Sequence, residues 1–239
     1  MRTDPENNRT RFVSFSGIDG AGKSTQIRRF CARMEQAGLR YSLVTFWDDV
    51  ARFKGLREGA AHAIFKGDRG VGSPAAPVNR RDKNVRSWMM TVVRLCLYMA
   101  DAISTRSLMR RSVRTNADVV IFDRFTYDEL ANLNLENAVM RAYARMIIKF
   151  VPQPHISFLL DADPAEARAR KPEYPLDFLQ FSRNSYLALS KMIGCMTIIA
   201  PLPAGEVERE VLIRVEGAFS SASPGGVSDR GQRLLESER

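Results

Sequence analysis

The chain has 239 residues, of which 45% are apolar and 26% charged, and a formal net charge of +9. This is ordinary globular usage, so a collagen, a coiled coil or a disordered chain is excluded for the whole sequence. The polar N-terminus lacks the apolar segment of a secretory signal, and no apolar stretch is long enough to cross a bilayer. The three cysteines, Cys31, Cys96 and Cys195, match neither a disulfide framework nor a metal site. We expect a cytoplasmic protein without a membrane partner.

The predicted elements begin with a short β-prone run over residues 12–16, followed by a glycine-rich segment and a helix that ends near Ala37. A second strand covers 40–46. The later strands are expected at 118–122, 155–160 and 196–200, and the later helices at 84–105, 128–149, 164–171, 176–193 and 205–218. Strands that alternate with helices predict an α/β fold whose mostly parallel sheet is covered on both faces.

The domain organisation is predicted from composition. Residues 1–219 form one domain with a basic insert over about 49–86, and the Ser, Gly, Pro and charged residues of 220–239 predict a disordered tail. Between residues 50 and 90, nine Lys or Arg residues stand against three acidic ones. This surplus forms either a solvated basic surface or a site for anions, namely phosphorylated small molecules, nucleic acid or acidic lipid, of which a small anionic ligand is expected. Nucleic acid is not expected as a partner, because no RNA-binding or zinc-finger signature accompanies these charges.

A phosphate-binding loop is the strongest motif. Gly17, four residues, then Gly22, Lys23 and Ser24 match the P-loop pattern between a strand and a helix. Glycines allow successive backbone N–H groups to turn toward phosphate oxygens, the lysine reaches the β- and γ-phosphates, and the serine hydroxyl is a ligand for Mg²⁺. The predicted ATP-binding residues are Gly17, Ile18, Asp19, Gly20, Ala21, Gly22, Lys23, Ser24 and Thr25.

Two charged segments follow later strands. Asp123 and Arg124 come directly after 118–122, at the edge of the sheet that faces the ligand in such folds. There the aspartate can hold Mg²⁺ through water, and the arginine can clamp a phosphoryl group. Arg168 and Arg170 lie on a short helix after the next strand, where a closing flap could bring them to the phosphates.

The segments FSGIDGAGKSTQ, VVIFDRF with Leu130-Ala131 after it, and LLDADPAEARAR resemble thymidylate kinase over about residues 12–48 and 95–217. The resemblance implies a P-loop NTPase fold with a five-stranded parallel sheet, ATP and Mg²⁺, a mobile lid, a possible homodimer and a role in nucleotide biosynthesis. It also implies that Asp19 lies near the acceptor's sugar hydroxyl and that Arg124 bridges the two phosphates. Since Ala21 stands where some members have arginine, Arg168 and Arg170 are expected to be catalytic, together with Lys23 and Arg124.

The sequence departs from the family on the acceptor side. Phe46-Trp47-Asp48-Asp49 replaces a glycine-rich segment, Ala102 follows Ala100-Asp101 where an arginine is expected, and Asn132-Leu133 replaces Tyr-Gln. A missing hydrogen-bond partner changes specificity strongly. The predicted acceptor-binding residues are Asp19, Trp47, Arg81, Arg86, Arg124 and Tyr127.

The best prediction is an ATP-dependent dTMP kinase-like phosphotransferase, in which Ser24 and Asp123 organise Mg²⁺. Two alternatives remain open. One is a kinase of the same fold that acts on another nucleotide, a nucleoside or a phosphosugar, and the other is a non-catalytic ATP-binding switch.

Overall fold

Five parallel strands form the centre of the protein in a computed structural model that describes residues 10–51 and 88–221. The strands are β1 (Arg11–Ser16), β2 (Tyr41–Thr45), β3 (Val119–Asp123), β4 (Ile156–Leu160) and β5 (Met196–Ile199). Their order in the sheet is β2-β3-β1-β4-β5, and every neighbouring pair is parallel. The expected parallel α/β sheet is therefore confirmed, with β1 at its centre.

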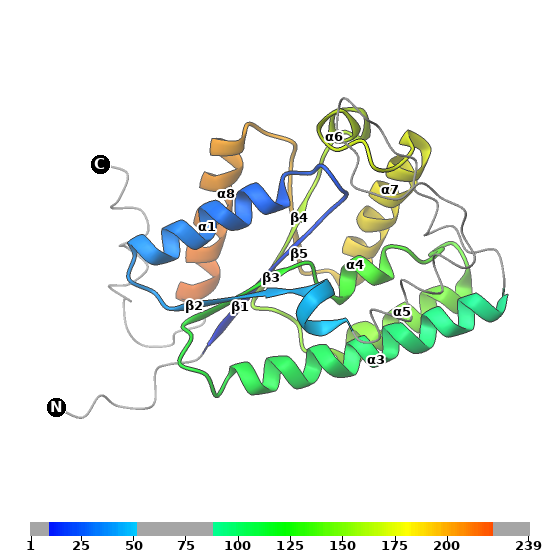
Figure 1. The fold of residues 1–239 in the computed structure, drawn as a ribbon, viewed down its shortest axis with the longest axis horizontal. Coiled ribbons are helices and arrows are strands. Elements are labelled where there is room, and N and C mark those ends of the chain that lie inside the picture. The colour runs from blue at the N-terminus through cyan, green and yellow to red at the C-terminus, as the bar shows by residue number, and fades with distance from the viewer. Residues whose placement is uncertain (1–9, 52–87, 222–239) are drawn as a thin grey trace.

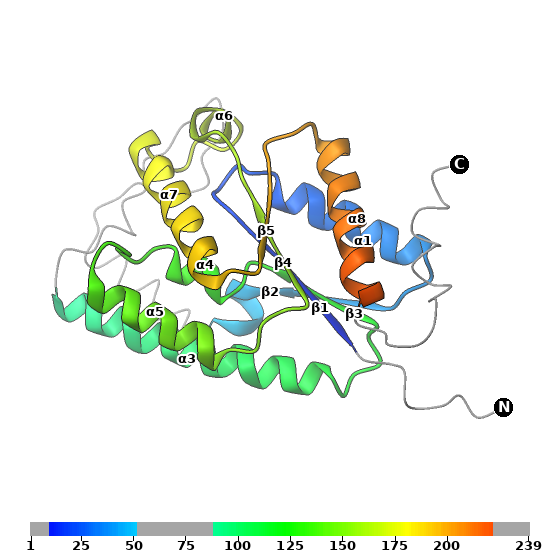
Figure 2. The same ribbon diagram turned by 180° about the vertical axis from the view of Figure 1, so that it is seen from behind.

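Helices cover both faces of the sheet (Figure 1). One face carries α1 (Lys23–Gln36) and α8 (Ala204–Ser221). The other carries α3 (Trp88–Ser112), α4 (Thr126–Leu130), α5 (Ala138–Phe150) and α7 (Leu176–Ile193). Figure 2 shows the same two layers from behind, with the short helix α6 (Pro164–Arg170) next to α7.

The central strands are buried on both faces, as their continuous apolar runs predict. Along β3, Val119 and Ile121 pack in the core beneath α1 and α8, whereas Val120 and Phe122 pack in the core on the other face. Successive side chains of a strand point to opposite faces, which explains this division. The same rigid sheet fixes the ends of β1 and β3, where the candidate site lies.

One expected helix is divided in the structure. The prediction of a single helix over 128–149 is wrong, because α4 ends at Leu130 and α5 begins at Ala138. The side chain of Asn137 accepts hydrogen bonds from the backbone N–H groups of Val139 and Met140. Such a cap satisfies N–H groups that have no partner inside the helix, so it favours a new start there.

The remaining boundaries agree closely, although α3 continues to Ser112, beyond the expected end at 105. A π-helical turn, η1 (Phe46–Val50), directly follows β2. Most of the basic insert and of the predicted tail, including Arg81 and Arg86, lies outside the described residues. Within residues 10–51 and 88–221, no helix is long and apolar enough to span a bilayer.

Candidate active site

The P-loop connects the buried end of β1 to the first residue of α1, as its sequence context predicts. Gly17, Gly20 and Gly22 have φ angles of 144°, 87° and 87°, a region that L side chains rarely adopt. Space also matters, because a Cβ atom on Gly20 would lie 2.2 Å from the carbonyl oxygen of Ala167. The tip of the loop therefore packs directly against the backbone of α6.

Lys23 lies across the loop that precedes it. Its Nζ donates hydrogen bonds to the carbonyl oxygens of Gly17 (2.7 Å) and Ile18 (2.8 Å), and the residue is only 6% exposed. Burial and, to a smaller extent, the charge of Arg124 lower the pKa of Lys23, the nearby carboxylates raise it, and the net result is a pKa of about 7. The protonation of this lysine therefore responds to any anion that approaches the loop.

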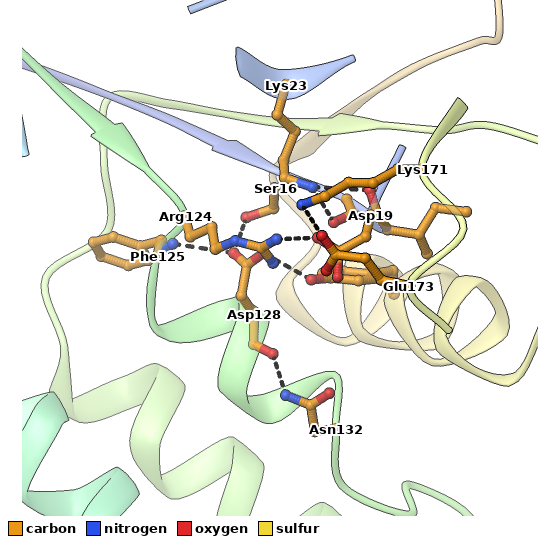
Figure 3. Close-up of polar contacts among 12 residues, drawn as sticks. Ser16, Asp19, Lys23, Arg124, Phe125, Asp128, Asn132, Lys171 and Glu173 are labelled. Carbon is orange, nitrogen blue, oxygen red and sulfur yellow. Dashed lines mark hydrogen bonds and ion pairs between the residues drawn. The ribbon is translucent and has the colours of Figure 1, made fainter. Parts of the chain in front are cut away.

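Arg124 is the centre of a charged cluster beyond the end of β3 (Figure 3). Its Nη2 pairs with Asp19 of the P-loop, and its Nη1 lies 3.4 Å from Oδ1 of Asp128. Burial lowers the pKa of Arg124, but Asp19 and Asp128 outweigh it, so the net shift is upward and the guanidinium stays charged. The structure thus brings together Asp19, Lys23 and Arg124, as the motifs predict.

Asp128 is a site residue that the sequence motifs did not identify. It is 2% exposed and accepts hydrogen bonds from the hydroxyls of Ser16 (2.6 Å) and Tyr186 (2.7 Å) and from the N–H of Phe125 (3.0 Å). The only signal in the sequence is its spacing, four residues after Arg124. Its partners come from β1 and α7, which only the fold brings together.

The predicted metal ligands lie on neighbouring elements. Ser24 is exposed in the first turn of α1, and Asp123 ends β3 opposite Phe15 of β1. Burial raises the pKa of Asp123, while Arg124, Lys23 and, more weakly, Lys171 counteract the rise. A hydroxyl and a carboxylate suit Mg²⁺, which takes few protein ligands and completes its shell with water and phosphate oxygens. In the part of the chain that the structure describes, no cluster of three or more His, Cys, Asp or Glu side chains could hold a metal by itself.

The predicted lid arginines lie on α6, whose first turn is capped by Asp163. Arg168 donates a hydrogen bond to the carbonyl oxygen of Tyr174 (2.9 Å), and the exposed Arg170 lies 3.5 Å from Glu166. Their catalytic role stays a prediction.

Lys171, the residue after α6, is a cation of the lid segment that the sequence analysis did not place in the site. It lies 3.2 Å from the buried Glu173, and Figure 3 shows both with the P-loop cluster. Because its charge reaches Asp123, Lys171 is a third candidate for phosphate contact.

A cavity of about 350 Å³ adjoins the P-loop at Ala21. Its walls are the end of β4, α6 and the loop between β5 and α8, with lining residues Leu160, Asp161, Ala162, Glu166, Arg170, Ile199, Ala200, Pro201, Leu202, Pro203 and Val207. Asp161 is held there by Arg183, whose Nε and Nη2 each lie 2.7 Å from a carboxylate oxygen. The volume is typical of a small-molecule site, and apolar side chains line it together with exposed polar atoms.

Two of the predicted acceptor residues, Trp47 and Tyr127, differ in how deeply they are buried. Trp47 is partly buried in η1 and meets Phe46 edge-on, with ring centroids 5.4 Å apart. Tyr127 is 2% exposed and packs edge-on against Phe125 in the core, where burial raises its pKa. Its position therefore lends no support to contact with an acceptor.

Comparison with known proteins points to one group. The "Probable thymidylate kinase" of Pyrobaculum calidifontis is 26% identical over 225 residues, which cover 88% of this chain and 98% of that protein. A second protein of that name, from Methanosphaera stadtmanae, is 23% identical over a match that covers 83% of this chain and 93% of that protein. The thymidylate kinase of Bifidobacterium longum is 26% identical over 75% and 83%, respectively. No family model matches the chain.

The chain is a thymidylate kinase-like protein. Its five-stranded parallel sheet and P-loop are those of the P-loop NTPase fold, and its class is that of the kinases, which are phosphotransferases. For a thymidylate kinase-like protein, the P-loop is the expected place for the phosphates of ATP. The sequence resemblance, its fold and its class are thereby confirmed.

Proposed function

We propose that this thymidylate kinase-like protein transfers the γ-phosphoryl group of ATP to the phosphate of dTMP, which gives ADP and dTDP. The observation that carries the proposal is the cluster at the ends of β1 and β3. There Arg124 pairs with Asp19 of the P-loop, on the same loop whose carbonyl groups hold Lys23. Two cations are thus gathered around a phosphate-binding loop, and the curated relatives named thymidylate kinase support the choice of acceptor.

The donor would bind along the P-loop. Backbone N–H groups of the loop and the N-terminus of α1 bind the phosphates, and Lys23 contacts the β- and γ-phosphates. The cavity beside Ala21 fits the adenosine part, because it combines apolar walls such as Ile199 and Pro201 with the polar Asp161. Ser24 and Asp123 would hold Mg²⁺, which neutralises charge on the β- and γ-phosphate oxygens.

The acceptor would bind on the side of Arg124. Its phosphate contacts this guanidinium, its sugar hydroxyl faces Asp19, and Trp47 of η1 stacks on its base. Arg81 and Arg86 of the basic insert also belong to the predicted acceptor set and lie outside the described residues.

During transfer, an oxygen of the acceptor phosphate attacks the γ-phosphorus in line, and the bond to the β–γ bridging oxygen breaks, so that ADP leaves. Lys23 and Arg124, with Arg168, Arg170 and Lys171 of the lid segment, stabilise the charge on the transferring group. Positioning and charge stabilisation therefore account for catalysis. The close packing of α6 on Gly20 helps to exclude water, which would otherwise hydrolyse ATP.

The test is the release of ADP from Mg-ATP with each member of an acceptor panel, namely dTMP, dUMP, the other nucleoside monophosphates, thymidine and phosphosugars, with the product identified by mass. We expect dTMP to give a rate well above the acceptor-free rate, with dTDP as product. Arg124→Met, in the same assay, controls for a contaminating kinase. Turnover with another acceptor but not with dTMP, or no turnover at all, contradicts the proposal.

A further inference from the structure

Asp128 is a buried carboxylate whose two oxygens are both engaged. Oδ2 accepts from the Ser16 hydroxyl at 2.6 Å and from the Phe125 N–H at 3.0 Å, while Oδ1 accepts from the Tyr186 hydroxyl at 2.7 Å and faces Arg124 at 3.4 Å. A buried carboxylate is costly unless charge and hydrogen bonds compensate it. Four donors from three parts of the chain supply that compensation here.

These donors join three elements around one side chain. Ser16 ends β1 immediately before the P-loop, Phe125 follows Arg124 in the turn after β3, and Tyr186 lies on α7. Burial and the charge of Asp128 both raise the pKa of Tyr186 well above its ordinary value, so its hydroxyl remains a donor. The carboxylate therefore connects the P-loop strand and α7 to the turn that carries Arg124. Figure 3 shows Ser16, Arg124 and Phe125 around Asp128.

The backbone conformation of Arg124 explains why this turn needs support from its surroundings. Among the described residues, Arg124 is the only one other than glycine with a positive φ, 69°. This left-handed conformation costs roughly 1–2 kcal/mol for an L residue, and it persists only where the surroundings impose it. The Arg124 N–H donates to the carbonyl oxygen of Phe15 (3.0 Å). The carboxylate of Asp128 accepts hydrogen bonds from the N–H of Phe125 and from the Arg124 guanidinium.

We propose that Asp128 is the positioning residue for Arg124 and that Tyr186 supports it from α7. Asp128 aligns the guanidinium between two carboxylates, so that its Nη2 faces Asp19 of the P-loop and its Nη1 faces α4. The inference rests on the proposed function, in which Arg124 contacts the transferring phosphoryl group. It assigns to α4 and α7 a part in catalysis without contact to substrate.

The test uses the full chain with Asp128→Asn and Tyr186→Phe, and Asp118→Asn as the matched control. Asp118 also pairs with an arginine, Arg40 (3.2 Å), but it lies at the opposite end of β3. We expect Asp128→Asn to lower kcat at least tenfold while the KM for ATP changes less than threefold, since Arg124 is misplaced and the P-loop is intact. Tyr186→Phe lowers kcat about threefold, and the double variant equals Asp128→Asn, because both act through one contact.

A binding measurement distinguishes the positioning of Arg124 from the effect of the charge lost at Asp128. It also tests the inference independently of the proposed function. Tripolyphosphate affinity, measured by calorimetry, needs no acceptor. Loss of one negative charge at Asp128 by itself would tighten the binding of a polyanion, whereas loss of the positioning of Arg124 weakens it. We expect at least threefold weaker binding, even if dTMP proves not to be the acceptor. Tighter binding by Asp128→Asn, or a folded Asp128→Asn variant whose kcat and affinity both stay within twofold of the wild type, overturns the inference. If Asp128→Asn does not fold, Tyr186→Phe decides, and a kcat within twofold of the wild type then overturns the inference.

Discussion

Two pairs of opposite charge in this protein have the same spacing of four residues and nearly the same length, yet their surroundings differ. Arg124 and Asp128 lie 3.4 Å apart with side chains 17% and 1% exposed. Glu166 and Arg170 of α6 lie 3.5 Å apart with side chains 72% and 52% exposed. Removal of one partner from a buried pair leaves a charge without compensation, whereas water compensates a partner at the surface.

This difference divides the charges of the site into two kinds. Arg124 is held between the carboxylates of Asp19 and Asp128, an arrangement that suits electrostatic preorganisation. The cations around α6 are partly or fully exposed, and water and salt screen them. The folded core thus fixes the position of the charged cluster around Arg124, whereas the lid segment adds charges that lie at the protein surface.

The largest effect is expected from Arg124→Met. It removes a charge from the phosphates and leaves Asp19 and Asp128 without their shared partner, so we expect kcat to fall by about 100-fold or more and the free energy of unfolding by about 3 kcal/mol. Glu166→Gln, which breaks the exposed pair, is expected to change that free energy by less than about 0.5 kcal/mol. Steady-state kinetics measure kcat, and urea unfolding measures the free energy of unfolding of the two variants. Equal losses of stability in the two variants would contradict the comparison.

The next effect concerns the contact between the P-loop and α6. In Gly20→Ala the new Cβ would lie 2.2 Å from the Ala167 carbonyl oxygen, so the loop or α6 must move, and we expect kcat to fall about tenfold or more. Gly38→Ala is the matched control, because Gly38 also has a positive φ, 67°, but no atom within 4 Å of its Cβ position. It should lose only about 1 kcal/mol of stability and keep its activity. Similar activity in the two variants would show that the close contact is not needed.

The lid cations should give smaller effects. We expect Lys171→Met to lower kcat by about tenfold, because its charge reaches the phosphate cluster at Asp123, and Arg170→Met to lower it less, because Arg170 is exposed. Both losses should diminish at high ionic strength, since exposed charges are screened. A larger loss of kcat in Arg170→Met than in Lys171→Met would show that Arg170, which the sequence predicts as catalytic, is the more important lid cation.

The smallest effect is a pH dependence of nucleotide binding. Since the pKa of Lys23 is lowered to about 7, the free protein loses this proton above pH 7, whereas bound phosphates favour the charged form. The affinity for Mg-ATP should therefore fall about fivefold between pH 7 and pH 8, and binding at pH 8 should take up nearly one proton. Calorimetry in buffers of different ionisation enthalpy measures this uptake. It should disappear in Lys23→Arg, and uptake that persists there would assign the proton to another group.

Much of this site was predictable from the sequence because its parts are local. The P-loop is a continuous segment whose glycines, lysine and serine each have a physical role, and Asp123-Arg124 directly follows an apolar run that is typical of a buried strand. Cap signals are weaker, so the sequence analysis predicts one helix where the structure has two, the second capped by Asn137.

Asp128, Lys171 and the cavity beyond β5 depend instead on contacts between distant segments. The partners of Asp128 lie up to 112 residues away, and the cavity combines the P-loop with residues near 200. The sequence by itself determined the class of fold and the phosphate-binding loop, because both follow from residue types at short spacing, whereas the kinase class followed from the resemblance to thymidylate kinase. Only the tertiary structure decided which charges are buried and paired, because burial and pairing are properties of packed elements rather than of any single segment.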